Sequence, residues 1–474
     1  MSKIKLFLEN FFVYGIGGII NKIIPLVMIP IVTRLLPDTS YFGISDMAVT
    51  VVSLCSLVAV MGLNDAMYRL FVEKEDLDYK KEICSTTLSI TMIISIIVFL
   101  LMLLFHDFIA EKCFGDNKYN YLVFITAVST LTGATNSIVS APTRMQNNRK
   151  TYIFMNVVTS VLSYSAAIVL ILNGYYIIAL PVGNMFASIS CEVIFFMINK
   201  KWFKVKYIKK RYLNELIKIG VPLLPGFLTY WLFNSCDRLM ITNMLGTAAT
   251  GVYSVGAKLG NVSQLIYTAF AGGWQYFAFS TMNEKNQVDT NSKIFEYLGI
   301  ISYICSIFVF VLCEGIYKIL FTGDYVKGYI VSPYLFLAPL LQMLFQVASN
   351  QLLIIKKTWP NIVVLMSGAI VNIILNIILI PKLGIEGAAI ASLIGYIVSD
   401  VLVVLLLIKM GLMRLDYKFI LISLLMILYI LLWRMFLMKL FVLNFLIGLI
   451  VCFTILYVYK KSVVQIINKI KRLN

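Results

Sequence analysis

Long apolar runs alternate with short polar segments along almost the whole chain. Each run has about 20 residues or more, enough for a helix rising about 1.5 Å per residue to cross a hydrocarbon core of about 30 Å. The pattern predicts an all-α integral membrane protein with about 14 transmembrane helices. The predicted spans are residues 11–33, 44–66, 84–106, 119–141, 152–173, 175–198, 217–244, 250–277, 295–316, 330–354, 360–381, 386–408, 418–437 and 440–459.

Composition agrees with a lipid environment. Hydrophobic residues make up 60% of the 474 residues, charged residues only 13%, and the mean hydropathy is +0.89. A soluble protein of this length cannot bury so much apolar surface. The eight cysteines form no C-x-x-C pair and lie mostly in apolar runs, so we expect small hydrophobic residues and no metal site or disulfide.

Lysine and arginine set the orientation. If the N-terminus is cytoplasmic, the segments on the inside carry most of the basic residues, among them the block from Lys200 to Arg211. This is the positive-inside pattern, and it predicts that both termini are cytoplasmic. The net charge of +17 therefore indicates topology and contact with anionic headgroups, and it does not indicate a nucleic acid partner.

Two matches point to an internal repeat. The segment at 148–172 aligns with 355–379, and "SYFGISDMA" aligns with "ATGVYSVGA", which places Gly43 over Gly251. Nearly equal offsets indicate two parallel six-span halves. We predict an N-lobe at 1–205 with spans 1–6, a C-lobe at 206–414 with spans 7–12, and two additional spans with a basic tail at 415–474. The basic block before span 7 is predicted to be a solvated linker.

Charged residues inside apolar runs are the candidate functional groups, because a charge at a helix centre costs about 2.5–3.5 kcal/mol and usually faces protein or water. Neighbours on a helix point about 100° apart, so Asp237 and Arg238 each need a separate partner. For this pair the alternative is that Arg238 reaches the outer headgroups while Asp237 accepts a hydrogen bond from a nearby helix. Candidate anion-binding cations are Lys22, Arg34, Arg238 and Lys258; possible coupling or structural charges are Asp46, Asp65, Glu192 and Asp237. Asp400 is a further charged residue within a predicted span.

Several enzyme classes lack support in the sequence. The chain has no Walker phosphate loop, no catalytic-triad pattern, no metal-ligand cluster and only short outside loops. We therefore predict a protein that is not an enzyme, with no cofactor and no metal.

Three stretches carry a family resemblance. "YGIGGIINKIIPLVMIPIVTRLLPDTSYFGISDM", "DRLMITNMLGTAATGVYSVGAKLG" and "IPKLGIEGAAIASLIGYIVSD" resemble the polysaccharide-repeat-unit flippases that move O-antigen or capsular units, within the multidrug/oligosaccharidyl-lipid/polysaccharide exporter superfamily. The resemblance implies two six-helix lobes in a V around a cavity that opens to each side in turn.

The implied function is alternating-access translocation of undecaprenyl-pyrophosphate-linked oligosaccharides of O-antigen, lipopolysaccharide or capsule. The implied location is the bacterial cytoplasmic (inner) membrane, where membrane lipids, a polysaccharide polymerase and glycosyltransferases are expected partners. Cations suit such a substrate because lysine and arginine bind phosphate. The alternatives are a lipid II flippase, a drug or cation antiporter of the same superfamily, and a scaffold that recruits glycosyltransferases through its basic loops.

The energy source is a separate expectation. Moving negative charge out of an inside-negative cell is favourable by about 2.3 kcal/mol per charge per 100 mV. We expect the membrane potential to assist export, with coupling to H⁺ or Na⁺ through Asp46, Asp65 or Glu192 as a further possibility.

Overall fold

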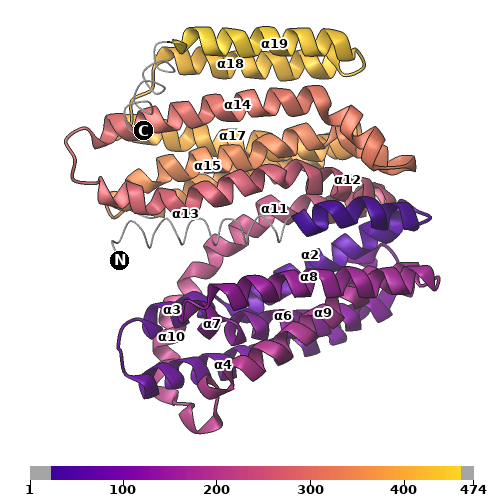
Figure 1. The fold of residues 1–474 in the computed structure, drawn as a ribbon, viewed down its shortest axis with the longest axis vertical. Helices are drawn as coiled ribbons and strands as arrows, with labels where there is room; N and C mark the ends of the chain where they lie inside the picture. Colours follow the sequence, from indigo (N-terminus) through magenta and orange to yellow (C-terminus); the bar gives the residue numbers. More distant parts are fainter. Residues whose placement is uncertain (1–22, 358, 461–474) are drawn as a thin grey trace. The chain divides into compact units, whose positions relative to one another are not determined.

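The computed structural model describes residues 23–357 and 359–460. The described residues form helices joined by short turns and contain no strand (Figure 1). Twelve of these helices are long and apolar enough to cross a membrane. The chain is therefore a multi-pass, all-α membrane protein, as the hydropathy pattern predicts.

The helices follow one another closely along the chain. The described part of the first span is the helix Ile23–Leu35. The later helices are α2 (Thr39–Val60), α3 (Leu63–Phe71), α4 (Leu77–Leu104), α5 (His106–Ile109), α6 (Asn120–Val139), α7 (Ala141–Met145), α8 (Arg149–Leu172), α9 (Tyr176–Asn199), α10 (Leu213–Gly220), α11 (Leu224–Leu245), α12 (Thr247–Gly260), α13 (Gln264–Ser280), α14 (Gln287–Leu320), α15 (Ser332–Ile354), α16 (Trp359–Leu383), α17 (Ile385–Lys409), α18 (Tyr417–Leu432) and α19 (Phe441–Val458).

Two predicted spans do not appear as single long helices. The first begins before the described residues, and Lys22 lies outside them. The eighth, predicted at 250–277, is divided into α12 and α13 by the 3₁₀ turn Asn261–Ser263. The remaining twelve predicted spans each overlap one of the twelve apolar helices, and the total of 14 stays a prediction.

The second predicted span is wrong at its end. The hydropathy pattern predicts a span at 44–66 that contains Asp65, but α2 ends at Val60 and Asp65 belongs to the short helix α3. Met61 (φ 48°) and Gly62 (φ 72°) adopt the left-handed conformation that ends a helix. The chain becomes less apolar beyond this break, but hydropathy alone does not locate the helix end to within a few residues.

The chain packs into two compact units. Among the described residues, unit 1 comprises the chain up to Lys258 together with Phe321–Gly328 and Ala369–Ala391, and unit 2 comprises Leu259–Leu320, Tyr329–Gly368 and the chain from Ser392 onward. α16 and α17 therefore contribute to both units. The predicted lobes at 1–205 and 206–414, the pair at 415–474 and the V-shaped arrangement stay predictions.

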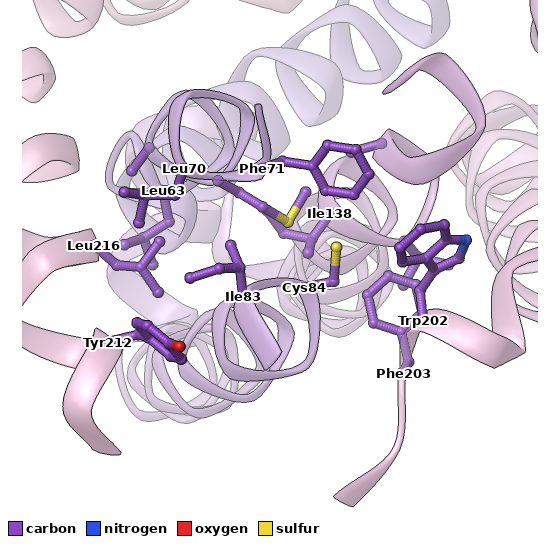
Figure 2. Packing of buried hydrophobic residues seen from close by; sticks show 14 of the residues in the cluster. Leu63, Leu70, Phe71, Ile83, Cys84, Ile138, Trp202, Phe203, Tyr212 and Leu216 are labelled. Atoms are coloured by element: carbon purple, nitrogen blue, oxygen red, sulfur yellow. The ribbon is translucent and has the colours of Figure 1, made fainter. Parts of the chain in front are cut away.

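A buried apolar cluster anchors the basic block to unit 1. Trp202 and Phe203 are buried on one side of this cluster, near Cys84 (Figure 2). Tyr212 is buried on its other side, near Ile83 and Leu216. The backbone carbonyl of Trp202 accepts a hydrogen bond of 2.9 Å from the Ser85 hydroxyl. The block is thus more than a solvated linker: its Trp202 and Phe203 are packed in a core, while its lysines remain exposed.

α2 and α12 cross at the two glycines that the repeat aligns. A Cβ atom added to Gly43 would lie 1.9 Å from the Thr247 carbonyl oxygen, and one added to Gly251 would lie 2.0 Å from the Thr39 carbonyl oxygen. The contact is reciprocal, as in an isologous interface. Gly43 meets Thr247, and Gly251 meets Thr39, the residue that the repeat aligns with Thr247. The backbones approach so closely that only glycine fits at either position.

We expect Gly43→Ala to destabilise unit 1 by about 3 kcal/mol or more, since a methyl group here meets rigid backbone and the two helices must separate. Thermal unfolding of the purified full chain in detergent measures this loss. Gly315→Ala is the matched control, because a Cβ there meets nothing within 4 Å. Equal unfolding temperatures for the two variants would show that the crossing does not require glycine.

Candidate functional site

Three polar side chains converge on the carboxylate of Asp46 in unit 1. Asp46, on α2, is 5% exposed. Arg238 Nε of α11 donates to Oδ2 at 2.5 Å, and Ser254 Oγ of α12 donates to the same oxygen at 2.7 Å. Lys258 Nζ of α12 lies 3.3 Å from Oδ1. We name these four residues the Asp46 cluster.

The cluster has a net charge of plus one, because one carboxylate is shared by two cations. The two cations differ in exposure: the Arg238 side chain is 11% exposed and the Lys258 side chain 38%. Ser254 and Lys258 are four residues apart, so they lie on the same face of α12. Arg238 is therefore the more buried of the two cations beside Asp46, and the ammonium group of Lys258 is the more accessible one to an anion.

Asp237, the neighbour of Arg238, has a different set of partners. It is 3% exposed and accepts hydrogen bonds from Tyr253 Oη at 2.7 Å and from Asn376 Nδ2 at 2.8 Å. Asn372 Nδ2 lies 3.5 Å from the same carboxylate. The donors come from α12 and α16, so Asp237 joins three helices, and the predicted need for two separate partners is met.

An open cavity of about 520 Å³ lies in unit 1 between α2, α3, α6 and α11. Most of its accessible lining surface is apolar, and hydroxyl and amide side chains lie among its aromatic and aliphatic residues. The lining residues are Ser53, Ser56, Leu57, Val60, Gly62, Asn64, Asp65, Gly133, Ser137, Phe227, Tyr230, Trp231, Asn234 and Ser235. We name it the polar cavity.

Two hydrogen bonds between α2 and α11, one at the polar cavity and one at the Asp46 cluster, show how far apart the two sites lie. Trp231 Nε1 donates to Ser53 Oγ at 2.9 Å, and Arg238 bonds to Asp46. Seven residues separate the two contacts on each helix, which is about two turns or about 10 Å. Because the numbers rise on one helix as they fall on the other, α2 and α11 run antiparallel, with the cavity and the cluster on one shared face.

The lining can recognise a polar, uncharged ligand with an apolar side. Trp231 and Tyr230 offer flat aromatic surfaces, while Ser53, Ser56 and Asn64 offer hydrogen-bonding groups around them. The carbonyl oxygen of the Asn64 side chain is buried and has no hydrogen-bond partner among the described residues. Leaving such an oxygen without a partner is costly, so a hydrogen bond donated to it would be favourable.

The other predicted residues have different positions. Asp65 lines the polar cavity from α3. Arg34 is exposed at the end of the helix Ile23–Leu35, and Glu192 is half-buried on α9; neither lines this cavity. Lys22 lies outside the described residues, so the predicted grouping of cations is described only for Arg238 and Lys258.

The aromatic and amide residues of the cavity were not predicted from the sequence, although a signal was present. Phe227, Trp231, Asn234 and Arg238 recur at intervals of four, three and four residues within "FLTYWLFNSCDRLMITNML". This spacing places them on one face of a helix. A search for charge alone finds only the last of them.

Comparison with protein families gives one match to more than half of the chain. Residues 7–282 match the model of a family described as polysaccharide biosynthesis protein. An uncharacterized membrane protein of Methanocaldococcus jannaschii is 26% identical over 238 residues, which are 49% of this chain. The chain matches 44% of the length of that relative.

Solved structures with the same fold include two kinds of transporter. The lipid II flippase MurJ in an inward closed conformation has a TM-score of 0.72 at 17% identity, covering 95% of this chain and 100% of the other. An inward-facing multidrug resistance MATE family transporter has a TM-score of 0.64 at 13% identity, covering 83% and 98%. At these identities the likeness establishes the fold.

Proposed function

The chain belongs to the polysaccharide biosynthesis protein family, and on that premise we propose that it is a flippase for undecaprenyl-pyrophosphate-linked oligosaccharides. It moves the repeat units of a surface polysaccharide, such as O-antigen or capsule, from the cytoplasmic to the outer leaflet by alternating access. The observation that carries this proposal is the Asp46 cluster beside the polar cavity in unit 1.

The two features match the two polar parts of the substrate. The accessible ammonium group of Lys258, with Arg238 behind it, supplies positive charge for the pyrophosphate. The polar cavity, about 10 Å away along α2 and α11, supplies aromatic faces and hydrogen-bonding groups for the sugars. In the predicted orientation the cavity lies on the cytoplasmic side of the cluster, so the sugars would enter first.

Two features of the chain and one of the substrate support transport. The chain has twelve apolar helices among its described residues, and its fold is that of flippases and exporters. The polyprenyl tail can stay in the lipid while the head group crosses along polar and positive side chains, so only the head group requires a path through the protein.

A transport assay tests the proposal. Purified chain is reconstituted in proteoliposomes with a labelled polyprenyl-pyrophosphate oligosaccharide, and an added enzyme that cannot cross the membrane reports how much reaches the opposite leaflet. We expect flipping well above that of protein-free liposomes. Equal rates with and without the chain would contradict the proposal.

Trp231→Ala is expected to slow this flipping about tenfold, since the sugars lose an aromatic face. Trp359→Ala is the matched control: Trp359 is 67% exposed at the start of α16 and outside the cavity, so its loss should leave the rate unchanged. If both variants flip as fast as the wild type, the polar cavity is not the saccharide site.

Lipid II is the second candidate substrate, favoured by the fold likeness to a lipid II flippase over 95% of this chain. Complementation separates the two: rescue of cell-wall synthesis supports lipid II, and rescue of surface polysaccharide supports the first proposal. The lipid-linked sugar that accumulates on the cytoplasmic face when the chain is deleted identifies the cargo directly.

A further inference from the structure

A second cavity, of about 390 Å³, lies in unit 2 between α14, α15, α17 and α18. It contains an unusual carboxyl group. Asp400 of α17 lines the cavity, is 8% exposed, and neither of its carboxyl oxygens has a hydrogen-bond partner among the described residues. A charged carboxylate in such surroundings is unstable unless a positive partner or a proton is supplied.

The other polar groups of the lining do not satisfy Asp400. Tyr303 Oη and Ser423 Oγ are hydrogen-bonded to each other at 3.0 Å. The remaining lining side chains are apolar, and no lysine or arginine is among them. The cavity thus offers one unpaired acid in a hydrocarbon-like setting and no group in its described lining that would attract an anionic ligand.

One wall of the cavity is aromatic. The rings of Tyr303 and Phe419 are stacked with centroids 6.1 Å apart, and Phe295 meets Phe419 edge to face at 5.7 Å. Aromatic faces attract cations, most strongly where water is excluded. A carboxyl group and an aromatic wall in one cavity are both complementary to an organic cation.

The opening of this cavity is lined by exposed apolar side chains. Val401, Leu405 and Leu424 line it and are 50%, 58% and 56% exposed. These residues belong to membrane-spanning helices, so a ligand would enter from the hydrocarbon. A metal ion of the hard class does not fit, because it needs about six oxygen ligands and the lining provides few.

We propose that this cavity binds a lipid-soluble organic cation, with Asp400 as its counter-ion and Phe295, Tyr303 and Phe419 as its aromatic wall. The volume suits a small drug-sized molecule. A lipid chain alone would fill the apolar space but leave both Asp400 oxygens without a partner. The site shares no residue with the Asp46 cluster or the polar cavity, so it stands independently of the proposed flippase function.

The test uses two probes of the same shape and opposite charge, tetraphenylphosphonium and tetraphenylborate. Binding of each labelled ion to the purified full chain in detergent is measured at equilibrium, with protein-free micelles subtracted. We expect the wild type to bind the cation, and Asp400→Asn to weaken cation binding by about tenfold or more, since the counter-ion is lost. Borate binding should not weaken.

Three further variants make the result decisive. Asp400→Glu should retain cation binding, and Phe419→Leu should weaken it severalfold. Glu314→Gln is the matched control, because Glu314 pairs with Lys318 at 2.7 Å and does not line the cavity; its binding should equal that of the wild type. The proposal is overturned if the wild type does not bind the cation, if Asp400→Asn binds it as tightly, or if both probes weaken in parallel.

Discussion

Asp46→Asn is expected to lower the free energy of unfolding by about 3–5 kcal/mol, because it leaves a buried guanidinium without its counter-ion. The Arg238 side chain is only 11% exposed, so water cannot replace the carboxylate. Lys258 loses the same partner but is 38% exposed and can be hydrated. Equilibrium unfolding of the purified chain in mixed micelles measures the change.

Asp289→Asn is the matched control for this loss of a carboxylate. Asp289 pairs with Arg414 at 3.2 Å, but the two side chains are 49% and 76% exposed, and exposed pairs contribute little. We expect little change in unfolding for this variant. A wild-type unfolding curve for Asp46→Asn would mean that Arg238 does not depend on Asp46.

The double variant Asp46→Asn with Arg238→Gln is expected to recover most of that stability yet lose export. It removes one negative and one positive charge, so the net charge of the cluster stays at plus one. A charge-assisted hydrogen bond to phosphate is worth about 1.5–3 kcal/mol, so flipping should fall by about ten- to a hundredfold. The proteoliposome assay gives the rate, and unfolding gives the stability.

The double variant separates two roles of Arg238. If Arg238 only neutralises Asp46, the double variant is both stable and active, and Lys258 alone binds the phosphate. If Arg238 also binds the substrate, stability returns without activity. Low stability in the double variant would instead indicate that the two side chains hold α2 against α11 through more than their charges.

Much of the fold was predictable because solvation in lipid is a local property. Each apolar run must satisfy its own backbone hydrogen bonds within one helix, so its length and composition suffice to identify it. The exceptions are backbone events that hydropathy does not register: the left-handed break at Met61 and Gly62, which removes Asp65 from the second span, and the 3₁₀ turn that divides α12 from α13.

The repeat was more informative than its weak letter similarity suggests. It aligned Gly43 with Gly251, and these positions meet at the crossing of α2 and α12. Three residues further along each helix, Asp46 accepts a hydrogen bond from Ser254, again 208 positions away. The offset of 208 residues can be found in the sequence, but the sequence does not show that residues at this offset are in contact.

The sequence by itself determined that this is an all-helical membrane protein, which helices are apolar, and which few charged residues lie among them. Only the tertiary structure decided the partners: Arg238 with Asp46 from 192 positions away, its neighbour Asp237 with Tyr253 and Asn376, and Asp400 with none among the described residues. The physical reason is that the cost of a charge in lipid depends on the residue itself, whereas its compensation depends on which side chains packing brings within about 3 Å.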